Sequence, residues 1–184
     1  MYFATSNVHK LVEARIVLEK FGITVRGIPK DSLEVQSDSL EEIARTSIIG
    51  VAQRVKSKVF VEDAGLFVHA LGGFPGPYSS YVHRTIGNEG LLKLLRGVRN
   101  RSAEFRSAVA CSEQGREPTV FSGKATGTII RQQRGNLGFG FDPIFTPDSG
   151  DGRTFAEMTS AEKNLLSHRA DALRKLGSWI LKHG

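Results

Sequence analysis

Two adjacent carboxylates, Glu62 and Asp63, follow the apolar run 59–61 and lead directly into Ala64 and Gly65. Such a pair at a strand end is typical of sites for Mg²⁺, which takes oxygen ligands, keeps several waters and shares its remaining positions with substrate phosphates. The motif therefore predicts a metal site that binds a phosphate ester. The alternative is a solvated acidic turn after a strand, which is the commoner outcome for an isolated motif of this kind.

A second polar segment lies at a strand-to-helix junction near the N-terminus and consists of Thr5, Ser6, Asn7, Val8, His9 and Lys10. The backbone N–H groups and the dipole of a helix that starts here favour an anion, so the segment suits a triphosphate. It lacks the glycines of a Walker loop. The alternative is structural: Ser6 or Asn7 caps the helix and Lys10 is solvated.

Two glycine-rich segments follow. Residues 72–80 contain three glycines and two prolines, a density that predicts a shaped loop, either a structural turn or a wall of the site. Residues 138–143 alternate glycine with Phe139 and Phe141, so that flat rings stand beside backbone that a ligand can approach closely. This arrangement suits a nucleobase. The alternative is a pair of core aromatics in a strand loosened by glycine.

A C-terminal helix predicted to begin at Ser160 carries Lys163 and Ser167 near one another, with His168 and Arg169 just beside them. The resulting face is cationic and rich in hydrogen-bond donors. A solvated basic helix is the usual explanation of such a run, and the pattern alone favours it.

Hydrophobic periodicity predicts the elements that hold these segments. The first half alternates strands with helices, which indicates an α/β sheet with some parallel pairing, and the second half is richer in strands, which indicates an antiparallel or mixed section. The predicted strands cover 2–4, 24–27, 59–61, 103–111, 119–127 and 128–131, and the predicted helices cover 9–21, 40–55 and 160–182.

Composition limits the functional classes. The 184 residues, 40% of them hydrophobic, are enough for one domain or for two lobes that share a sheet, and we expect a single domain over 1–184. One cysteine, Cys111, excludes an internal disulfide. The absence of a signal-like N-terminus or a run of ~20 apolar residues predicts a cytoplasmic protein without a membrane partner. A net charge of +6 and a pI near 9.7 suit an anionic partner, either nucleic acid or a polyphosphate nucleotide.

Taken in order, the motifs closely resemble those of the inosine triphosphate pyrophosphatase family, also called the Ham1 family, over nearly the whole chain. The matching motifs are Thr5-x-Asn7-x-x-Lys10-x-x-Glu13, Val61-Glu62-Asp63-Ala64-Gly65-Leu66, Gly73-Phe74-Pro75-Gly76-Pro77-Tyr78-Ser79, Gly138-Phe139-Gly140-Phe141-Asp142-Pro143, Thr154-Phe155-Ala156-Glu157-Met158 and Ser167-His168-Arg169.

The resemblance implies a Mg²⁺-dependent hydrolase that cleaves ITP, dITP or XTP between the α and β phosphates and so clears these purine nucleotides from the nucleotide pool. It also implies a homodimer. The implied fold is an elongated mixed β-sheet flanked by helices, in two lobes with the nucleotide in the cleft between them. In the implied mechanism, Asp63 or a metal-bound hydroxide supplies the nucleophilic water at the α-phosphorus, and pyrophosphate leaves.

The resemblance also assigns roles by position. Asp63 matches the proton acceptor and metal ligand, and Glu34 matches a second metal carboxylate, while Glu62 supports the same site. Thr5 to Lys10 match the triphosphate-binding segment. Ala64 stands where the family usually has Ser or Thr, so that its backbone N–H would remain as a phosphate contact. The remaining matches are the base-stacking strand Phe139, Gly140, Phe141 and Asp142, a substrate-binding lysine at Lys163, and the pair His168 and Arg169 at the purine edge.

Donors at the purine edge suit a 6-oxo group and oppose the 6-amino group of adenine. Guanine shares the 6-oxo group and must be rejected at its 2-amino group, either by crowding or by absent acceptors.

The sequence departs from the family pattern at one further position. The family usually carries a lysine in the helix before the Glu-Asp motif, yet 43–52 contains none. Either Arg45, Arg54 or Lys56 compensates, or the phosphate contact is weaker.

Two rival functions remain. One is a pyrophosphatase of related fold that prefers canonical or modified pyrimidine nucleotides. The other is a nucleic-acid-binding protein without catalysis, motivated by the pI and by Phe139 and Phe141 as stacking groups. Against the second, paired carboxylates repel a phosphate backbone unless a metal is present, and the basic residues are scattered rather than gathered in a stripe.

Overall fold

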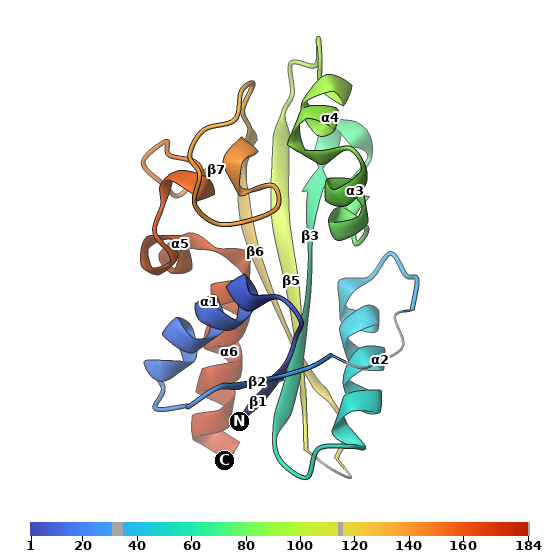
Figure 1. Ribbon diagram of the computed structural model, residues 1–184, viewed down its shortest axis with the longest axis vertical. Coiled ribbons are helices and arrows are strands. Elements are labelled where there is room, and N and C mark those ends of the chain that lie inside the picture. The colour runs from blue at the N-terminus through green and yellow to red at the C-terminus, as the bar shows by residue number, and fades with distance from the viewer. Residues whose placement is uncertain (31–34, 114–115, 184) are drawn as a thin grey trace.

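The computed structural model describes residues 1–30, 35–113 and 116–183 and shows a mixed α/β fold (Figure 1). The strands are β1 Tyr2–Ala4, β2 Arg26–Ile28, β3 Val59–Val68, β4 Pro75–Gly76, β5 Ser102–Ser112, β6 Thr119–Ile129 and β7 Phe145–Pro147. The α-helices are α1 Val8–Glu19, α2 Leu40–Ala52, α3 Ser79–Thr85, α4 Gly87–Leu94, α5 Ser160–Leu166 and α6 His168–His183, and the 3₁₀ turns are η1 His69–Leu71, η2 Asp142–Ile144 and η3 Phe155–Glu157.

The strands form one seven-stranded sheet in the order β2-β1-β3-β5-β6-β7, with β4 paired to β3. β1 is parallel to both β2 and β3, and the remaining pairs are antiparallel. This topology confirms the predicted mixed sheet, parallel in the first half of the chain and antiparallel in the second. Across the described ranges, none of the helices combines the length and apolar character that crossing a membrane requires.

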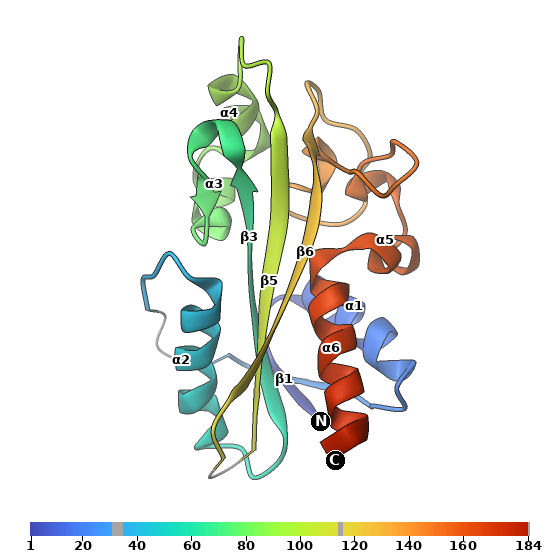
Figure 2. The same ribbon diagram turned by 180° about the vertical axis from the view of Figure 1, so that it is seen from behind.

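Helices cover both faces of the sheet because the side chains of β3 alternate between them. Phe60 points toward α1 and α6 and stacks on Phe3, with ring centroids 4.3 Å apart. Val59 and Val61 point the other way, into an apolar cluster with α2. Figures 1 and 2 show α1 and α6 on one side of the strands and α2 on the other.

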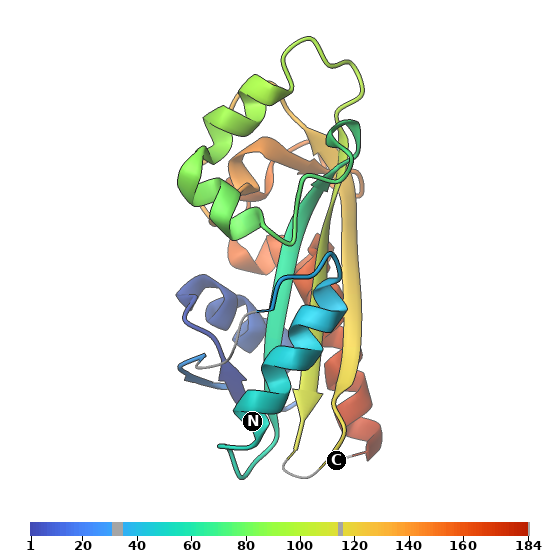
Figure 3. The ribbon, with the colours of Figure 1, turned by 90° about the vertical axis from the view of Figure 1, so that its right-hand side faces the viewer.

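One side of β3 is left open in the middle of the sheet. β1 pairs with Val59 and Phe60, and β4 pairs with Leu66 and Phe67. Between these positions, no strand in the described ranges pairs with 61–65 on that side, whereas β5 pairs with the other side throughout. Figure 3 shows α1 and β1 below this edge and α3 and α4 above it. The predicted carboxylate motif lies in this interval.

The expectation that the strand ends at Glu62 and Asp63 is wrong, because β3 runs on to Val68 without interruption. Gly65 serves a different purpose there. A Cβ atom on Gly65 would lie 2.2 Å from the carbonyl oxygen of Gly76, so only glycine allows β4 to pair this closely. The carboxylates are therefore held in a strand, not in a turn.

Three further expectations differ from the structure. The predicted strand 128–131 is the end of β6, which reaches Ile129. The predicted helix 160–182 is broken at Ser167, whose extended backbone ends α5 and whose hydroxyl accepts a hydrogen bond from the N–H of Ala170 in the first turn of α6 (3.2 Å). The short helices α3 and α4 were not predicted.

Candidate active site

The open edge of β3 borders a cavity of about 550 Å³ that gathers most of the predicted site residues. The cavity is lined by Thr5, Ser6, Asn7, Lys10, Lys30, Glu62, Asp63, Ala64, Gly65, Ser79, Ser80, His83, Arg84, Phe105, Phe139, Gly140, Phe141, Asp142, Lys163, His168 and Arg169. Of the predicted residues in the described ranges, Val8 and His9 do not line it. Glu34 lies outside the described residues.

The N-terminal segment combines both interpretations made from the sequence. Asn7 caps α1, since its side-chain oxygen accepts from the N–H of Lys10 (3.2 Å), and Asn7 N–H donates to Thr5 Oγ1 (3.1 Å). Lys10, however, is not simply solvated. Its ammonium lies 2.7 Å from Glu62 Oε2 and donates to the backbone oxygen of Glu62 (3.3 Å). The segment is thus tied to the carboxylate motif on β3.

Glu62 is fully buried and has three polar partners. Besides Lys10, it accepts from Ser107 Oγ (2.7 Å) and from Arg169 Nε (3.0 Å). Burial raises the pKa of Glu62, but the charges of Arg169 and Lys10 more than offset this, and the pKa lies well below its usual range. Glu62 is therefore a carboxylate anion whose oxygens are occupied by the protein itself.

Asp63, the next residue along β3, differs in exposure and in its partner. Its side chain is 22% exposed and lies on the opposite face of the strand from Glu62. The ammonium of Lys30 is 3.4 Å from Asp63 Oδ2 and 3.5 Å from Oδ1, a long contact compared with the 2.7 Å of Lys10 to Glu62. Asp63 is consequently the carboxylate of the cavity that remains reachable from solvent.

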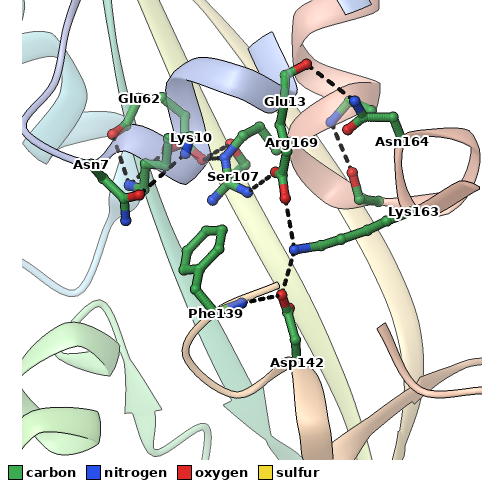
Figure 4. A network of polar contacts seen from close by, with 12 residues as sticks. Asn7, Lys10, Glu13, Glu62, Ser107, Phe139, Asp142, Lys163, Asn164 and Arg169 are labelled. Atoms are coloured by element: carbon green, nitrogen blue, oxygen red, sulfur yellow. Dashed lines mark hydrogen bonds and ion pairs between the residues drawn. The ribbon is translucent and has the colours of Figure 1, made fainter. Parts of the chain in front are cut away.

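A second buried carboxylate, Glu13 on α1, joins the cationic residues of α5 and α6 (Figure 4). Its Oε1 lies 2.9 Å from Lys163 Nζ, and its Oε2 accepts from Arg169 Nη1 at 2.5 Å. Lys163 also donates to Asp142 Oδ2 (2.6 Å). Burial raises the pKa of Glu13, but Arg169 and Lys163 outweigh it and the net pKa is lowered.

These contacts form a chain of alternating charge, which we call the ionic chain: Lys10, Glu62, Arg169, Glu13, Lys163 and Asp142. It runs from the first turn of α1 to Asp142, the first residue of η2. Lys163 and Arg169 are each only 2% exposed, so the solvated basic helix favoured by the sequence pattern is wrong. The break at Ser167 permits this arrangement, because it places the two cations on separate helices that both approach Glu13.

The residues predicted as a base-stacking strand form a loop and the first residue of η2 instead. Asp142 shapes this loop by accepting from the N–H of Phe139 (2.9 Å), and a Cβ on Gly138 would lie 2.2 Å from the same carboxylate. The ring of Phe139 is partly exposed, stacks on His9 (5.2 Å) and has Lys163 Nζ 4.7 Å from its centroid. Phe141, in contrast, is buried. Of these two phenylalanines, Phe139 is therefore the one whose ring is an accessible stacking surface in the cavity.

His168 is buried beside Phe105, with the ring centroids 4.7 Å apart and the planes inclined by 9°. Burial lowers the pKa of His168 well below its usual value, and the charge of Arg169 lowers it further, so the imidazole is neutral at pH 7. Its Nδ1 has no hydrogen-bond partner among the described residues. A neutral imidazole has one donor nitrogen and one acceptor nitrogen, so the unpartnered Nδ1 can donate or accept according to the tautomer.

Sequence reasoning missed several residues of the cavity wall, namely Lys30, His83, Arg84 and Phe105. Ser79 and Ser80 belong to the segment 72–80 that was expected to be a turn or a wall of the site, and they lie on α3 together with His83 and Arg84. None of the three residues suggested as substitutes for the usual lysine, Arg45, Arg54 and Lys56, lines the cavity. The additional lysine found in the wall is Lys30.

The residues present are compatible with a divalent cation whose coordination shell is completed by oxygen atoms of the substrate. In the described parts of the chain, no group of three or more His, Cys, Asp or Glu side chains is arranged so that it could hold a metal ion by itself. Asp63 supplies one accessible carboxylate. Mg²⁺ is commonly held by one or two carboxylates together with substrate phosphates, whereas an all-protein cage is unusual for it.

Comparisons with known proteins agree with this geometry. The Ham1 family model matches residues 1–179. A dITP/XTP pyrophosphatase of Methanopyrus kandleri is 50% identical over 96% of this chain and 94% of its own, and one of Thermococcus kodakarensis is 49% identical over 97% and 95%. The solved Ham1 protein of Staphylococcus aureus has a TM-score of 0.84 at 29% identity over 100% of this chain and 98% of its own, and that of Coxiella burnetii 0.85 at 29% over 98% of each. The chain belongs to the Ham1 family.

Proposed function

We propose that this protein hydrolyses non-canonical purine nucleoside triphosphates such as dITP, ITP and XTP to the monophosphate and pyrophosphate. The observation that carries the proposal is the cavity itself. It joins a helix start with Asn7 and Lys10, an accessible carboxylate at Asp63 and an accessible ring at Phe139. Relatives up to 50% identical are named dITP/XTP pyrophosphatases, which supports the same substrate class.

The phosphates would lie at the start of α1. Asn7 uses its side-chain oxygen as the cap, and the N–H groups of this first turn point toward an anion. Lys10 has two contacts with Glu62, so one of its three ammonium protons remains for a phosphate oxygen. Ala64 would contribute its backbone N–H, because it lies on the open edge of β3.

Asp63 would act as the general base. Its carboxylate accepts a proton from a water molecule as the oxygen of that water attacks the α-phosphorus, the bond from the α-phosphorus to the bridging oxygen breaks, and pyrophosphate leaves. Asp63, together with Glu34, would also hold Mg²⁺. The metal, when bound, would neutralise negative charge on the phosphates.

Base selectivity would follow from which hydrogen-bonding groups are already occupied. The carboxylates of Glu13, Glu62 and Asp142 are all paired within the ionic chain. Donors remain: Arg169 uses Nε and Nη1 for Glu62 and Glu13, while its Nη2 forms no hydrogen bond with the described residues. A pocket with spare donors and occupied acceptors favours 6-oxo and 2-oxo groups.

The same argument bears on guanine, for which the sequence left crowding and absent acceptors as alternatives. The occupied carboxylates support absent acceptors. A buried 2-amino group of guanine, or 6-amino group of adenine, would lose its hydrogen bonds to water without replacement, at a cost of roughly 1–3 kcal/mol. This corresponds to about one or two decades of discrimination.

The test is pyrophosphate release from ITP, XTP, GTP, ATP and a pyrimidine triphosphate, with and without Mg²⁺. We expect Mg²⁺-dependent release from ITP and XTP that exceeds release from GTP and ATP. Preferential release from the pyrimidine triphosphate would favour the related pyrimidine pyrophosphatases. Release from none of them, combined with tight and salt-dependent RNA or DNA binding, would favour the nucleic-acid-binding alternative.

Two broader expectations belong to the same proposal. We place the enzyme in the cytoplasm, where its substrate pool resides, and we expect a homodimer in solution. Light scattering coupled to size-exclusion chromatography measures the mass directly. A monomeric mass at micromolar concentration would contradict the dimer without affecting the proposed chemistry.

A further inference from the structure

The wall of the cavity formed by α3 has no role in the function proposed above. Ser79, Ser80, His83 and Arg84 all line the cavity, and their spacing along the chain places them on one side of the helix. Ser79 is used structurally: its hydroxyl accepts from the N–H of Leu66 (2.8 Å) and donates to the carbonyl of Gly76 (2.7 Å). These bonds fix the start of α3 beside the open interval of β3.

Arg84 differs from every other lysine or arginine of the cavity wall. Lys10, Lys163 and Arg169 each have a carboxylate partner within 3.0 Å. Lys30 lies 3.4 Å from Asp63. Arg84 is exposed and forms no ion pair with any of the described residues. An anion can therefore contact its guanidinium without displacing a protein carboxylate.

His83, its neighbour, contributes in a different way. The imidazole meets the edge of Phe141 with ring centroids 5.2 Å apart and planes at 90°. This contact, together with the Ser79 hydrogen bonds, attaches α3 at both ends of the segment that faces the cavity. Arg84 is thus an exposed side chain on a helix whose position is fixed by these contacts. Figure 3 shows α3 above the open interval of β3 and α1 below it.

We propose that Arg84 binds the β- and γ-phosphates of the nucleotide from the wall opposite α1, so that the leaving pyrophosphate is held between Lys10 and Arg84. A planar guanidinium matches two phosphate oxygens and forms charge-assisted hydrogen bonds with them. The end of the cavity that faces the base already has Lys163 and Arg169 as donors, and the negative charge of the ligand lies in its phosphates. This inference rests on the proposed function for its choice of ligand.

The experiment uses the two reaction products, because neither is turned over. Isothermal titration calorimetry in Mg²⁺ buffer measures Kd for inorganic pyrophosphate and for IMP with wild type, Arg84→Ala, Arg84→Lys and Arg96→Ala. Arg96 is the matched control, because it is an exposed arginine near the end of α4 that does not line the cavity. Thermal melts check that all variants are folded.

We expect Arg84→Ala to weaken pyrophosphate binding about 10- to 100-fold, as for a lost hydrogen bond to a charged group, and to weaken IMP binding less than threefold. Arg84→Lys should recover part of the loss, and Arg96→Ala should match wild type. Unchanged pyrophosphate binding in Arg84→Ala would overturn the inference. Equal losses for IMP and pyrophosphate would also overturn it, since they would place Arg84 elsewhere.

The outcome separates this inference from the proposed reaction. If wild type releases pyrophosphate from ITP while Arg84→Ala binds pyrophosphate normally, the reaction stands and the Arg84 inference is wrong. If wild type hydrolyses no triphosphate but binds pyrophosphate through Arg84, the inference stands and the proposed reaction is wrong.

Discussion

Glu62 and Asp63 are neighbours on β3 and both line the cavity, yet their side chains lie on opposite faces of the strand. Glu62 points toward α1 and α6, is fully buried and is held by Lys10, Ser107 and Arg169 at 2.7–3.0 Å. Asp63 points to the other face and is 22% exposed, and its polar partner among the described residues is Lys30, at 3.4–3.5 Å. The two adjacent carboxylates therefore differ in availability: the oxygens of Glu62 are occupied by protein groups, and those of Asp63 can be reached by a ligand.

The two carboxylates therefore have different roles in our proposal: Glu62 positions other groups, and Asp63 takes part in the reaction. An anion whose oxygens are taken by buried cations fixes those cations in place, and here it orients Lys10 for phosphate and Arg169 for the base. An accessible carboxylate with one long contact is able to accept a proton or a metal ion. The ionic chain is thus the rigid half of the site, and the Asp63 side is the half where chemistry takes place in our proposal.

The largest effect is expected at Asp63. Asp63→Asn keeps the shape of the side chain but removes its charge, so kcat for pyrophosphate release should fall on the order of 10²–10⁴-fold. Thermal stability should stay nearly constant, because the side chain is partly exposed and weakly paired. Turnover equal to wild type at saturating Mg²⁺ would show that Asp63 is not the base.

Glu62→Gln should act mainly on stability. The substitution removes the buried counter-ion of Lys10 and one of the two counter-ions of Arg169, which keeps Glu13. Breaking a buried pair costs roughly 3–5 kcal/mol of unfolding free energy. Urea denaturation of Glu62→Gln measures this change. Asp171→Asn is the control, since it removes the exposed pair with Lys175 and should cost less than about 1 kcal/mol. Equal costs for the two variants would refute the structural role of the ionic chain.

Phe139 and Phe141 provide a second matched pair. Phe139→Ala should raise KM for ITP about 5- to 150-fold, because base–aromatic stacking is worth roughly 1–3 kcal/mol, while the melting temperature changes little. Phe141→Ala should lower stability by roughly 3–5 kcal/mol, as for a buried aromatic. Steady-state kinetics and thermal melts of both variants distinguish the two roles. A raised KM in Phe141→Ala together with a loss of stability in Phe139→Ala would show that the roles are the other way round.

The smallest effect is expected in the acid dependence of stability. The folded-state pKa values of Glu13 and Glu62 lie below their ordinary 4.5. Their contribution to the free energy of unfolding is therefore complete above pH 4.5 and is lost as pH falls below it. Each group contributes a slope of at most about 1.4 kcal/mol per pH unit. Burial raises the pKa of Asp142, so this group has the opposite effect: its contribution lowers the free energy of unfolding as pH rises.

Urea titrations between pH 3 and 7 measure this slope. Glu13→Gln and Glu62→Gln should each flatten the acid limb relative to wild type, whereas Asp171→Asn should leave its shape unchanged. An acid limb that is identical in all four proteins would mean that the buried carboxylates do not titrate with unfolding.

The sequence predicted the regular elements better than the contacts between them. Periodicity located the long helices and strands, because apolar spacing in α2, β5 and β6 is local information. It missed α3 and α4, which are short and follow a glycine-rich loop. It also ended the strand at the carboxylates, because the need for glycine at Gly65 comes from the backbone of Gly76 and not from the neighbours of Gly65 in the sequence.

The candidate site shows the same division. The resemblance to a family brought together Thr5, Asp63, Phe139 and Arg169, which the structure places around one cavity. The pairing of Glu13 with Arg169 joins residues far apart in the sequence and leaves no local signal. The basic pattern in the C-terminal region was therefore interpreted as a solvated helix, although buried carboxylates from other segments accept its charges. Arg84 had no motif at all, and only the fold places it at the cavity.

The Mg²⁺ dependence of pyrophosphate release from ITP tests the contrast between the two carboxylates most directly. It should be measured for wild type, Asp63→Asn and Glu62→Gln, with the last held below its melting temperature. We predict that Asp63→Asn raises the half-saturating Mg²⁺ concentration at least about tenfold, as for the loss of a metal ligand, and that Glu62→Gln leaves it unchanged. A raised Mg²⁺ requirement in Glu62→Gln, with none in Asp63→Asn, would contradict the account.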